Sequence, residues 1–403
     1  MRGLAGPGRT ALVFHLGGVT GPGHSLRGVA AALAREGEVH CLVPEPGWTA
    51  DTYSAYGPVG VGGYATLTYA RGPVEGARLA RRLGRDVRTL RAAFRRIRPD
   101  LVVVVTTTLP AALLAARLER VPAVVYAAEL YDQGWKRARL LRTWGRVLAT
   151  ATELAADSVV CCSEAVAAQF PGSPERISVA YPPIRPDVAG GDRARGRSRY
   201  GVEAADPCLA VVGSVTRGRG QDVAVRALAS VREHLGAAEL LIVGDPHPRP
   251  VDFAFADELR ALATELGVEE AVHFAGATGA VADVFAAADV VINPARFAEP
   301  FGRVAPEALA AGRPVIASRV GALEEVLEHE RTALLVPPDD PAALAAAAVR
   351  LYADDALRER LVADGRAEVL ARFTDEAALD TWAGALGRLG RRAQNAPRPL
   401  TTA

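Results

Sequence analysis

The chain has 403 residues, 50% of them hydrophobic and 23% charged, which suits two or three globular domains with buried cores. The net charge of +1 gives no support for a nucleic-acid-binding protein. Apolar stretches long enough to span a bilayer are absent from the sequence, and residues 1–10 lack the apolar core of a secretion signal. We therefore expect a cytoplasmic protein, with peripheral attachment to the inner face of the membrane left open.

Short apolar runs alternate with amphipathic, helix-like segments along the whole chain. The runs are 11–16, 39–43, 101–105, 123–127 and 158–162 in the first half, and 209–212, 240–243, 272–274, 290–293, 315–318 and 334–336 in the second. Continuous Val, Ile and Leu runs bounded by Gly or Pro are typical of strands buried on both faces of a parallel sheet. Because helical patterns separate these runs, we predict right-handed strand–helix–strand units.

A polar segment rich in Gly and Arg interrupts this alternation at residues 191–206 and is interpreted as a linker. We therefore predict an α/β protein with two doubly wound, Rossmann-like domains, at 1–190 and 207–373, and a ligand in the cleft between them. A helix at 374–392 is expected to pack back toward the N-terminal domain. Residues 393–403 are expected to be a disordered tail.

The first predicted strand is followed by a glycine-rich turn, Gly17 to Ser25, which precedes a helix. Such a turn lets a phosphate or an acceptor approach the backbone closely, and Gly23 is assigned to ligand binding on that ground. His24 has two interpretations: an acid/base residue, or an ordinary polar residue at a helix start.

Charge is unevenly distributed between the halves. Residues 1–185 hold 23 Lys and Arg against 14 Asp and Glu, whereas residues 186–403 hold 24 against 32. The helical pattern Arg78–Arg98 has one apolar stripe and arginines elsewhere. Its basic face is either solvated or docks on anionic lipid, and both interpretations remain open.

Glu129 follows the predicted strand 123–127 and either lines an acceptor site or is an ordinary acid at a strand end. Cys161 and Cys162 lie in an apolar run, and the four cysteines of the chain show no metal-ligand spacing. We expect reduced, structural thiols.

In the second half, the loop after strand 209–212 contains Ser214, Arg217 and Arg219 among glycines and precedes a helix. Glycine permits a tight backbone, and guanidinium groups provide the charge to bind a diphosphate without a metal ion. We expect no metal site and no cofactor, because the Asp-Asp pairs of this half lie in turns or at a helix start.

Two further turns should lie at the same edge of the second sheet. Gly244 and Asp245 follow strand 240–243, and Asp245 is either a ligand contact or a turn residue. Ala277 and Thr278 follow strand 272–274 and are small enough for a nucleotide base to lie against the backbone.

The segment Glu299–Leu309 follows strand 290–293 and has the strongest pattern in the chain. Pro300 keeps Glu299 extended, Gly302 permits close approach, and a helix then begins. The amides of residues 301–304 (Phe301, Gly302, Arg303 and Val304) are predicted to cradle a phosphate. Glu299 and Glu307 would accept hydrogen bonds from sugar hydroxyls, although each alone could be an acid favoured at a helix start.

Residues from about Ala210 to Pro338 resemble the family 4 glycosyltransferases, which are retaining enzymes of the GT-B fold. The family signature is an acidic residue, seven further residues and a second acidic residue. Glu299 and Glu307 fit this spacing, and Glu299 begins the sequence Glu-Pro-Phe-Gly, which also fits. The segment 310–317 (Ala-Ala-Gly-Arg-Pro-Val-Ile-Ala) and the turns at 213–220, 243–245 and 320–325 also fit. The resemblance is weaker over the first half.

The resemblance implies that Glu299 contacts the transferred sugar and Glu307 the ribose. Arg219 stands where the family usually has a diphosphate-binding Lys, and Ser214 where many members have an Arg, for which Arg217 would compensate. The family often has a His after the strand at 123–127, where this sequence has Ala127, Ala128 and Glu129.

The predicted function is transfer of a sugar, with retention, from a UDP- or GDP-type nucleotide sugar bound by the C-terminal domain. The acceptor, bound by the N-terminal domain, would be a hydroxyl of a glycan, a lipid-linked glycan or a small metabolite. Two alternatives are a nucleotide-sugar epimerase of the same fold and a non-catalytic nucleotide-sugar-binding protein.

Overall fold

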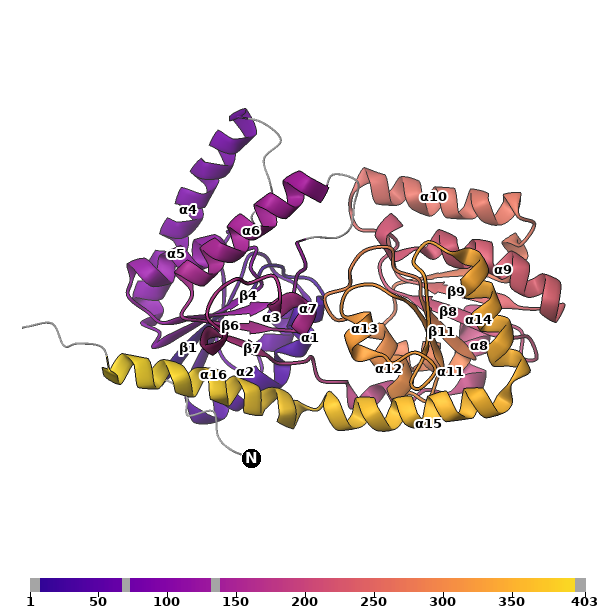
Figure 1. Ribbon diagram of the computed structural model, residues 1–403. Helices are drawn as coiled ribbons and strands as arrows, with labels where there is room; N and C mark the ends of the chain where they lie inside the picture. The colour runs from indigo at the N-terminus through magenta and orange to yellow at the C-terminus, as the bar shows by residue number, and fades with distance from the viewer. Residues whose placement is uncertain (1–7, 67–72, 132–137, 396–403) are drawn as a thin grey trace, which may run out of the picture. The chain divides into compact units, whose positions relative to one another are not determined.

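The computed structural model describes residues 8–66, 73–131 and 138–395, which form two compact α/β units (Figure 1). The described residues up to Pro183, together with the last helix, make up unit 1. Residues Ile184–Thr374 make up unit 2.

Unit 1 is built on a parallel sheet of seven strands in the order β3-β2-β1-β4-β5-β6-β7. The strands are β1 (Arg9–Val13), β2 (Glu38–Val43), β3 (Val59–Val61), β4 (Leu101–Val105), β5 (Ala123–Ala127), β6 (Ser158–Cys161) and β7 (Ile177–Val179). Every residue of β4 and β5 is buried, because helices cover both faces of the sheet.

The helices of unit 1 form two layers. They are α1 (Gly21–Ser25), α2 (Arg27–Glu36), α3 (Trp48–Tyr53), α4 (Pro73–Ile97), α5 (Pro110–Leu118), α6 (Ala138–Ala155), α7 (Glu164–Ala167) and α16 (Asp375–Asn395). In Figure 1, α4, α5 and α6 lie along the upper side of the sheet, and α2 and α16 along its lower side.

Unit 2 has a six-stranded parallel sheet in the order β10-β9-β8-β11-β12-β13. The strands are β8 (Cys208–Val212), β9 (Glu239–Val243), β10 (Val272–Gly276), β11 (Val290–Asn293), β12 (Val315–Ser318) and β13 (Leu334–Val336). In both sheets the first strand lies between the second and the fourth, so the strand order reverses beside it. The predicted fold of two doubly wound sheets is confirmed.

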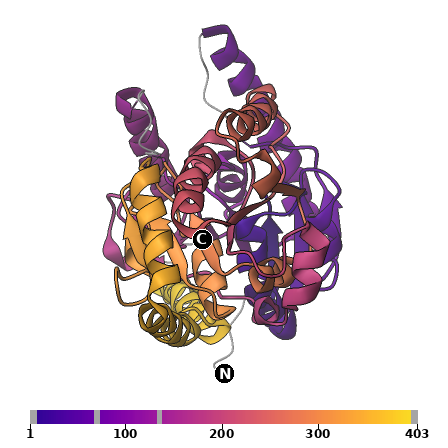
Figure 2. The same cartoon turned by 90° about the vertical axis from the view of Figure 1, so that its right-hand side faces the viewer.

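Helices lie on both sides of the sheet of unit 2 (Figure 2). They are α8 (Arg193–Tyr200), α9 (Gln221–Leu235), α10 (Pro250–Glu265), α11 (Val281–Ala287), α12 (Val304–Ala310), α13 (Leu323–Val326), α14 (Pro341–Ala353) and α15 (Asp355–Arg372). Leu228 and Val231 of α9 and Leu344 of α14 pack with Leu240 and Ile242 of β9 in one fully buried cluster.

The expected linker differs from the structure. Residues 191–206 contain α8, and the chain passes into unit 2 earlier, at Ile184. The arginines that make this segment look like a linker are partly structural: Arg197 is 3% exposed and donates hydrogen bonds to the carbonyl groups of Ala287 and Asp206. At least one of the arginines that give the segment its polar composition is therefore part of the packed unit.

The chain returns to unit 1 at Asp375, and α16 packs there on α2, β6 and β7. Trp382 of α16 is 1% exposed, and its ring lies 6.0 Å from that of Tyr126. Of the expected tail, residues 393–395 belong to α16, and residues 396–403 lie outside the described part of the chain.

Two properties concern the chain as a whole. Among the described residues, no helix has both the length and the apolar character needed to cross a membrane. Cys41, Cys161, Cys162 and Cys208 are all buried free thiols.

Candidate active site

The carboxyl ends of β8 and β11 lie side by side where the strand order of unit 2 reverses. In doubly wound sheets, ligands bind at this point. The loop after β8 and the loop after β11 pack directly on each other, since Arg296 donates from its backbone N–H to the carbonyl of Gly218 at 2.9 Å. Gly220, at φ 71°, lies so close to Pro294 that a Cβ atom there would be 2.0 Å from the carbonyl oxygen.

Arg219 and Glu299 come from these two loops and form an ion pair between Nη1 and Oε1. The Glu299 side chain is 3% exposed, whereas that of Arg219 is 30% exposed. The Arg219 guanidinium also lies over the Phe297 ring, 5.4 Å from its centroid. The pair thus joins a buried carboxylate to a cation that is reachable from solvent.

The backbone of Glu299 is fixed by the turn after β12. Its carbonyl accepts a hydrogen bond from the N–H of Ala322 at 2.9 Å, and it forms a parallel bridge with Gly321. A Cβ atom on Gly321, which has φ 55°, would lie 2.5 Å from the Glu299 carbonyl oxygen. Only glycine fits this position without displacing Glu299.

Glu307 is on α12, 6% exposed, and bound by two arginines through one oxygen. Arg303 Nη2 lies 2.7 Å and Arg185 Nε 3.7 Å from Oε1.

The segment between the two glutamates packs into the unit before α12 begins at Val304. The Phe301 ring is buried and meets Phe373 edge-on, with centroids 5.2 Å apart. Gly302 has φ 74°, and a Cβ atom there would lie 2.5 Å from a methyl carbon of Leu323. The first turn of α12 has backbone N–H groups without an intrahelical acceptor.

The structure separates Arg217 from Arg219. Arg217 pairs with Glu258 of α10, and its guanidinium lies 5.0 Å from the Phe255 ring centroid. The carbonyl of Ser214 accepts a hydrogen bond from the side chain of Gln221 at 3.0 Å. Of the three polar side chains predicted in this loop, only that of Arg219 contacts a glutamate of the signature.

Asp245, Ala277 and Thr278 form a neighbouring group at the ends of β9 and β10. The Asp245 carboxylate accepts a hydrogen bond from the N–H of Ala277 at 3.1 Å, as a turn residue does. The Thr278 hydroxyl lies 3.3 Å from that of Tyr200. Gly244 has φ 144°, and a Cβ atom there would lie 2.0 Å from the carbonyl oxygen of Gly213.

In unit 1, Gly23 and His24 lie in α1, within the glycine-rich segment after β1. A Cβ atom on Gly23 would meet the Thr20 hydroxyl at 2.9 Å and the Trp48 ring at 3.0 Å. The His24 ring lies against Trp48, with centroids 4.4 Å apart. The tight turn therefore carries a histidine packed on an aromatic ring.

Glu129 lies beyond the end of β5 and is bound to the end of β4. Its Oε2 accepts hydrogen bonds from the N–H and hydroxyl of Thr107, at 3.2 and 3.1 Å, and from the N–H of Ala128 at 3.2 Å. Burial outweighs these donors and raises the pKa of the carboxyl.

Two family models match the chain. Residues 19–188 match the model described as Glycosyltransferase Family 4, and residues 206–354 match Glycosyl transferases group 1, so the matches include most of both units. The chain belongs to glycosyltransferase family 4. The resemblance found in its second half is thereby extended to the first.

Solved structures agree with the GT-B fold of this family. HepE from Anabaena, solved in complex with UDP-glucose, superimposes with a TM-score of 0.79 at 22% identity, over 94% of this chain and 99% of HepE. Sucrose-phosphate synthase from Thermosynechococcus elongatus gives a TM-score of 0.75 at 24% identity, over 96% of this chain and 100% of the synthase.

Curated relatives are similar over shorter stretches. A D-inositol 3-phosphate glycosyltransferase from Mycobacteroides abscessus is 38% identical over 167 residues, 41% of this chain and 36% of the relative. An uncharacterized glycosyltransferase from Methanocaldococcus jannaschii is 30% identical over 218 residues, 52% of this chain and 54% of the relative. The chain thus matches about half or less of the length of these relatives.

Three residues of this family 4 protein lie near the predicted groups but escaped the sequence analysis. Arg185 contacts Glu307. His247 follows β9, and burial, followed by the charges of Arg249 and Arg219, lowers its pKa. His15 follows the end of β1, and burial lowers its pKa to about 4. The two histidines follow strand ends, a position that could have marked them.

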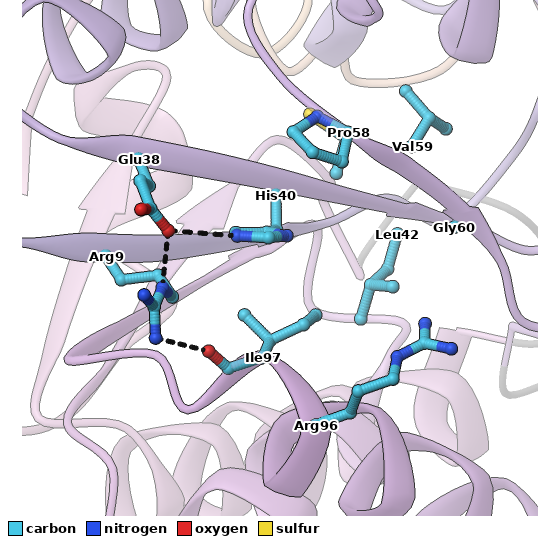
Figure 3. Close-up of a pocket in the computed structure, with 10 residues that line it drawn as sticks. Arg9, Glu38, His40, Leu42, Pro58, Val59, Gly60, Arg96 and Ile97 are labelled. Atoms are coloured by element: carbon cyan, nitrogen blue, oxygen red, sulfur yellow. Dashed lines mark hydrogen bonds and ion pairs between the residues drawn. The ribbon is translucent and has the colours of Figure 1, made fainter.

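A cavity of about 430 Å³ lies elsewhere in unit 1 of this family 4 chain (Figure 3). Arg9 and Glu38, the first residues of β1 and β2, line it, so it is at the amino end of the sheet. Arg9 Nε donates to Glu38 at 2.7 Å, and Nη1 donates to the carbonyl of Ile97 at 2.9 Å. None of the predicted site residues lines it, and we do not assign the substrate to it.

Proposed function

We propose that the chain transfers a sugar from a UDP- or GDP-type nucleotide sugar to an acceptor hydroxyl, with retention and without a metal ion. The observation that supports this most directly is the pair of buried glutamates, Glu299 and Glu307, each held by arginine at the reversal point of the sheet in unit 2. Family membership supplies the expectation of sugar transfer and of retention.

The Arg219–Glu299 ion pair suggests an exchange of partners. A donor diphosphate would take Arg219, whose exposed side reaches solvent, and thereby release the Glu299 carboxylate for hydroxyl groups of the sugar. The Oε2 atom of Glu307 would accept a hydrogen bond from the ribose. Each charged group then has a partner in both the free and the bound protein.

Bond cleavage leaves negative charge on the departing diphosphate. Arg219 and the backbone N–H groups before α12 would stabilise that charge without reorganising. The departing phosphate oxygen would take the proton of the acceptor hydroxyl on the same face of the sugar, so that the new bond forms with retention. Glu129 and His24 of unit 1 would contact the acceptor.

The comparisons suggest which substrates to try first. HepE was solved in complex with UDP-glucose, so UDP donors come before GDP donors. Several relatives are named as D-inositol 3-phosphate glycosyltransferases, and the first 185 residues have a surplus of basic residues, so a phosphorylated small acceptor is the first choice.

A thermal-shift screen of the full chain with nucleotides and nucleotide sugars tests the donor site. A ligand at a hundred times its Kd adds about 2.7 kcal/mol to the unfolding free energy. Incubation of the stabilising nucleotide sugar with D-inositol 3-phosphate, and with lipid and glycan extracts, should then give an α-configured glycoside from an α-configured donor. An inverted product would contradict retention.

Two controls separate the alternatives. An epimerase would change the sugar of the donor when no acceptor is present, and mass and NMR analysis of donor-only incubations would reveal this. A non-catalytic binding protein would leave the donor unchanged with every acceptor, although it would still be stabilised by the nucleotide.

A further inference from the structure

One side of unit 1 is a layer of three helices, α4, α5 and α6, with α5 between the other two (Figure 1). Arg117 of α5 donates to the carbonyl of Leu154 of α6, which ties the ends of these helices together. The layer covers one face of the sheet, and its outer face is turned away from the sheet.

Four large apolar side chains protrude from this outer face. On α5, Leu114 is 38% and Leu118 56% exposed; on α6, Val147 is 54% and Leu154 67% exposed. Positions four apart on α5 and seven apart on α6 lie on one side of each helix, so each helix presents an apolar stripe outward. A cluster of this kind on two adjacent helices is typical of an interaction surface.

Arginines surround these apolar side chains. Residues 75–98, 110–120 and 145–155 contain twelve arginines, at positions 78, 81, 82, 85, 88, 91, 95, 96, 98, 117, 120 and 146, but only four acids, at 75, 86, 119 and 153. The structure shows how three of these acids are bound. Asp86 is buried, Glu119 binds Arg91 and Arg95, and Glu153 accepts from the N–H of Gly172 at 2.8 Å.

The basic face of α4 points away from the core. Leu90, Phe94 and Ile97 are buried, whereas Arg81, Arg88 and their neighbours on the opposite side of the helix are exposed. Neither Arg81 nor Arg88 forms an ion pair within the described part of the chain. The positive charge of this face is therefore not neutralised within unit 1.

We propose that the outer face of α4, α5 and α6 docks unit 1 on an anionic lipid surface. Headgroup phosphates would meet the arginines, and Leu118 and Leu154 would enter the boundary of the acyl chains. A nucleic acid would satisfy the arginines but offer nothing to the exposed leucines and valine. The proposal does not depend on the donor or the reaction.

Cosedimentation of the full chain with vesicles tests this surface. We expect binding to phosphatidylcholine vesicles that contain about 30% phosphatidylglycerol, weak binding to phosphatidylcholine alone, and loss of binding at high salt. The double variant Arg81→Gln/Arg88→Gln should reduce the partition coefficient about 25-fold, since each basic residue contributes about fivefold near such a surface. Leu118→Ser/Leu154→Ser should reduce it about tenfold.

Matched variants on unit 2 serve as controls. Arg226→Gln/Arg360→Gln removes two exposed arginines, and Val251→Ser/Phe253→Ser removes two apolar side chains that are 57% and 53% exposed. Both should bind vesicles like the wild type, and every variant should keep the wild-type melting temperature. The proposal is overturned by failure of the wild type to cosediment, by equal losses in the controls, or by a dimer that dissociates in the leucine variant.

Discussion

At the scale of single residues, Glu299 and Arg219 are partners in an ion pair, and this affects what substitution of Glu299 should do. Glu299→Gln keeps the shape of the side chain but removes the charge that competes for Arg219. We expect UDP to bind the variant at least as tightly as the wild type, while sugar transfer falls by a hundredfold or more, about 2.7 kcal/mol in the barrier. Calorimetric titration with UDP and an initial-rate assay measure both. Weaker UDP binding would contradict the exchange of partners.

Arg185 is a positioning residue for Glu307, because its guanidinium approaches the same oxygen as Arg303. Arg185→Gln should let the carboxylate turn and reduce the preference for UDP over 2′-deoxy-UDP by about threefold to tenfold. Arg185→Lys should restore part of the preference. Titration of both nucleotides into wild type and variants gives the ratios, and Arg350→Gln, at an exposed site of the same unit, should leave the ratio unchanged.

The raised pKa of Glu129 implies a pH dependence of stability. The folded protein binds the proton more tightly than the unfolded chain, so the stability that this carboxyl contributes is complete below its ordinary pKa of about 4.3 and is lost as the pH rises through the raised pKa of the folded state. Two pH values, about 5 and about 8, sample this loss. Glu129→Gln keeps an oxygen acceptor for Thr107 and cannot lose a proton. Urea unfolding of both proteins at the two pH values should show a smaller loss of stability in the variant. Parallel pH profiles would show that Glu129 is ionised throughout.

The sequence analysis found site residues that lie close together in the chain and missed one that folding brings in from afar. Glu299 and Glu307 were predicted because one loop and one helix start fix their spacing. Arg185 gave no such signal, since it precedes the first strand of unit 2 and reaches Glu307 only through the folded unit. Arg217 was assigned to the phosphate with Arg219, and no local pattern indicated that Glu258 of α10 would hold it.

At the scale of elements, one turn supports the position of the loop that contains Glu299. Gly321→Ala would place a Cβ atom against the backbone of Glu299 and would strain a residue with φ 55°. We expect a loss of about 2 kcal/mol or more in unfolding free energy, and a fall in sugar transfer at saturating donor that exceeds the loss of UDP affinity. Gly236→Ala is the control, because Gly236 also has a positive φ but has open space around it. This variant should lose unfolding free energy and keep the wild-type rate of sugar transfer.

The apolar runs in the sequence were sufficient to predict eleven of the strands that form the seven-stranded and the six-stranded sheet. The two that escaped, β3 and β7, have three residues each and are only partly buried, so that neither shows a continuous apolar run. The segment 191–206 was interpreted as a linker because its arginines resemble a solvated surface. Arg197 is in fact buried beside Asp289, with which it pairs at 2.9 Å. Composition alone cannot distinguish these two environments.

At the scale of the whole molecule, the described residues pass between the units after Pro183 and again after Thr374, and both passages begin beside the loop that contains Phe301. Ile184 donates from its N–H to the carbonyl of Phe373 at 2.9 Å, and the Phe373 ring lies against Phe301. The segments that enter and leave unit 2 are thus bonded to each other next to Glu307.

The stability of unit 1 depends on α16, which follows the whole of unit 2 in the sequence. Trp382→Ala removes a side chain that is 1% exposed and whose ring lies 6.0 Å from that of Tyr126 in β5, and it should cost about 3 to 5 kcal/mol of stability in unit 1. Unit 2 has its own sheet and core, so UDP binding should persist. Differential scanning calorimetry should show that the substitution lowers one transition and that UDP raises the other. A single transition shifted by both would mean that the units unfold together.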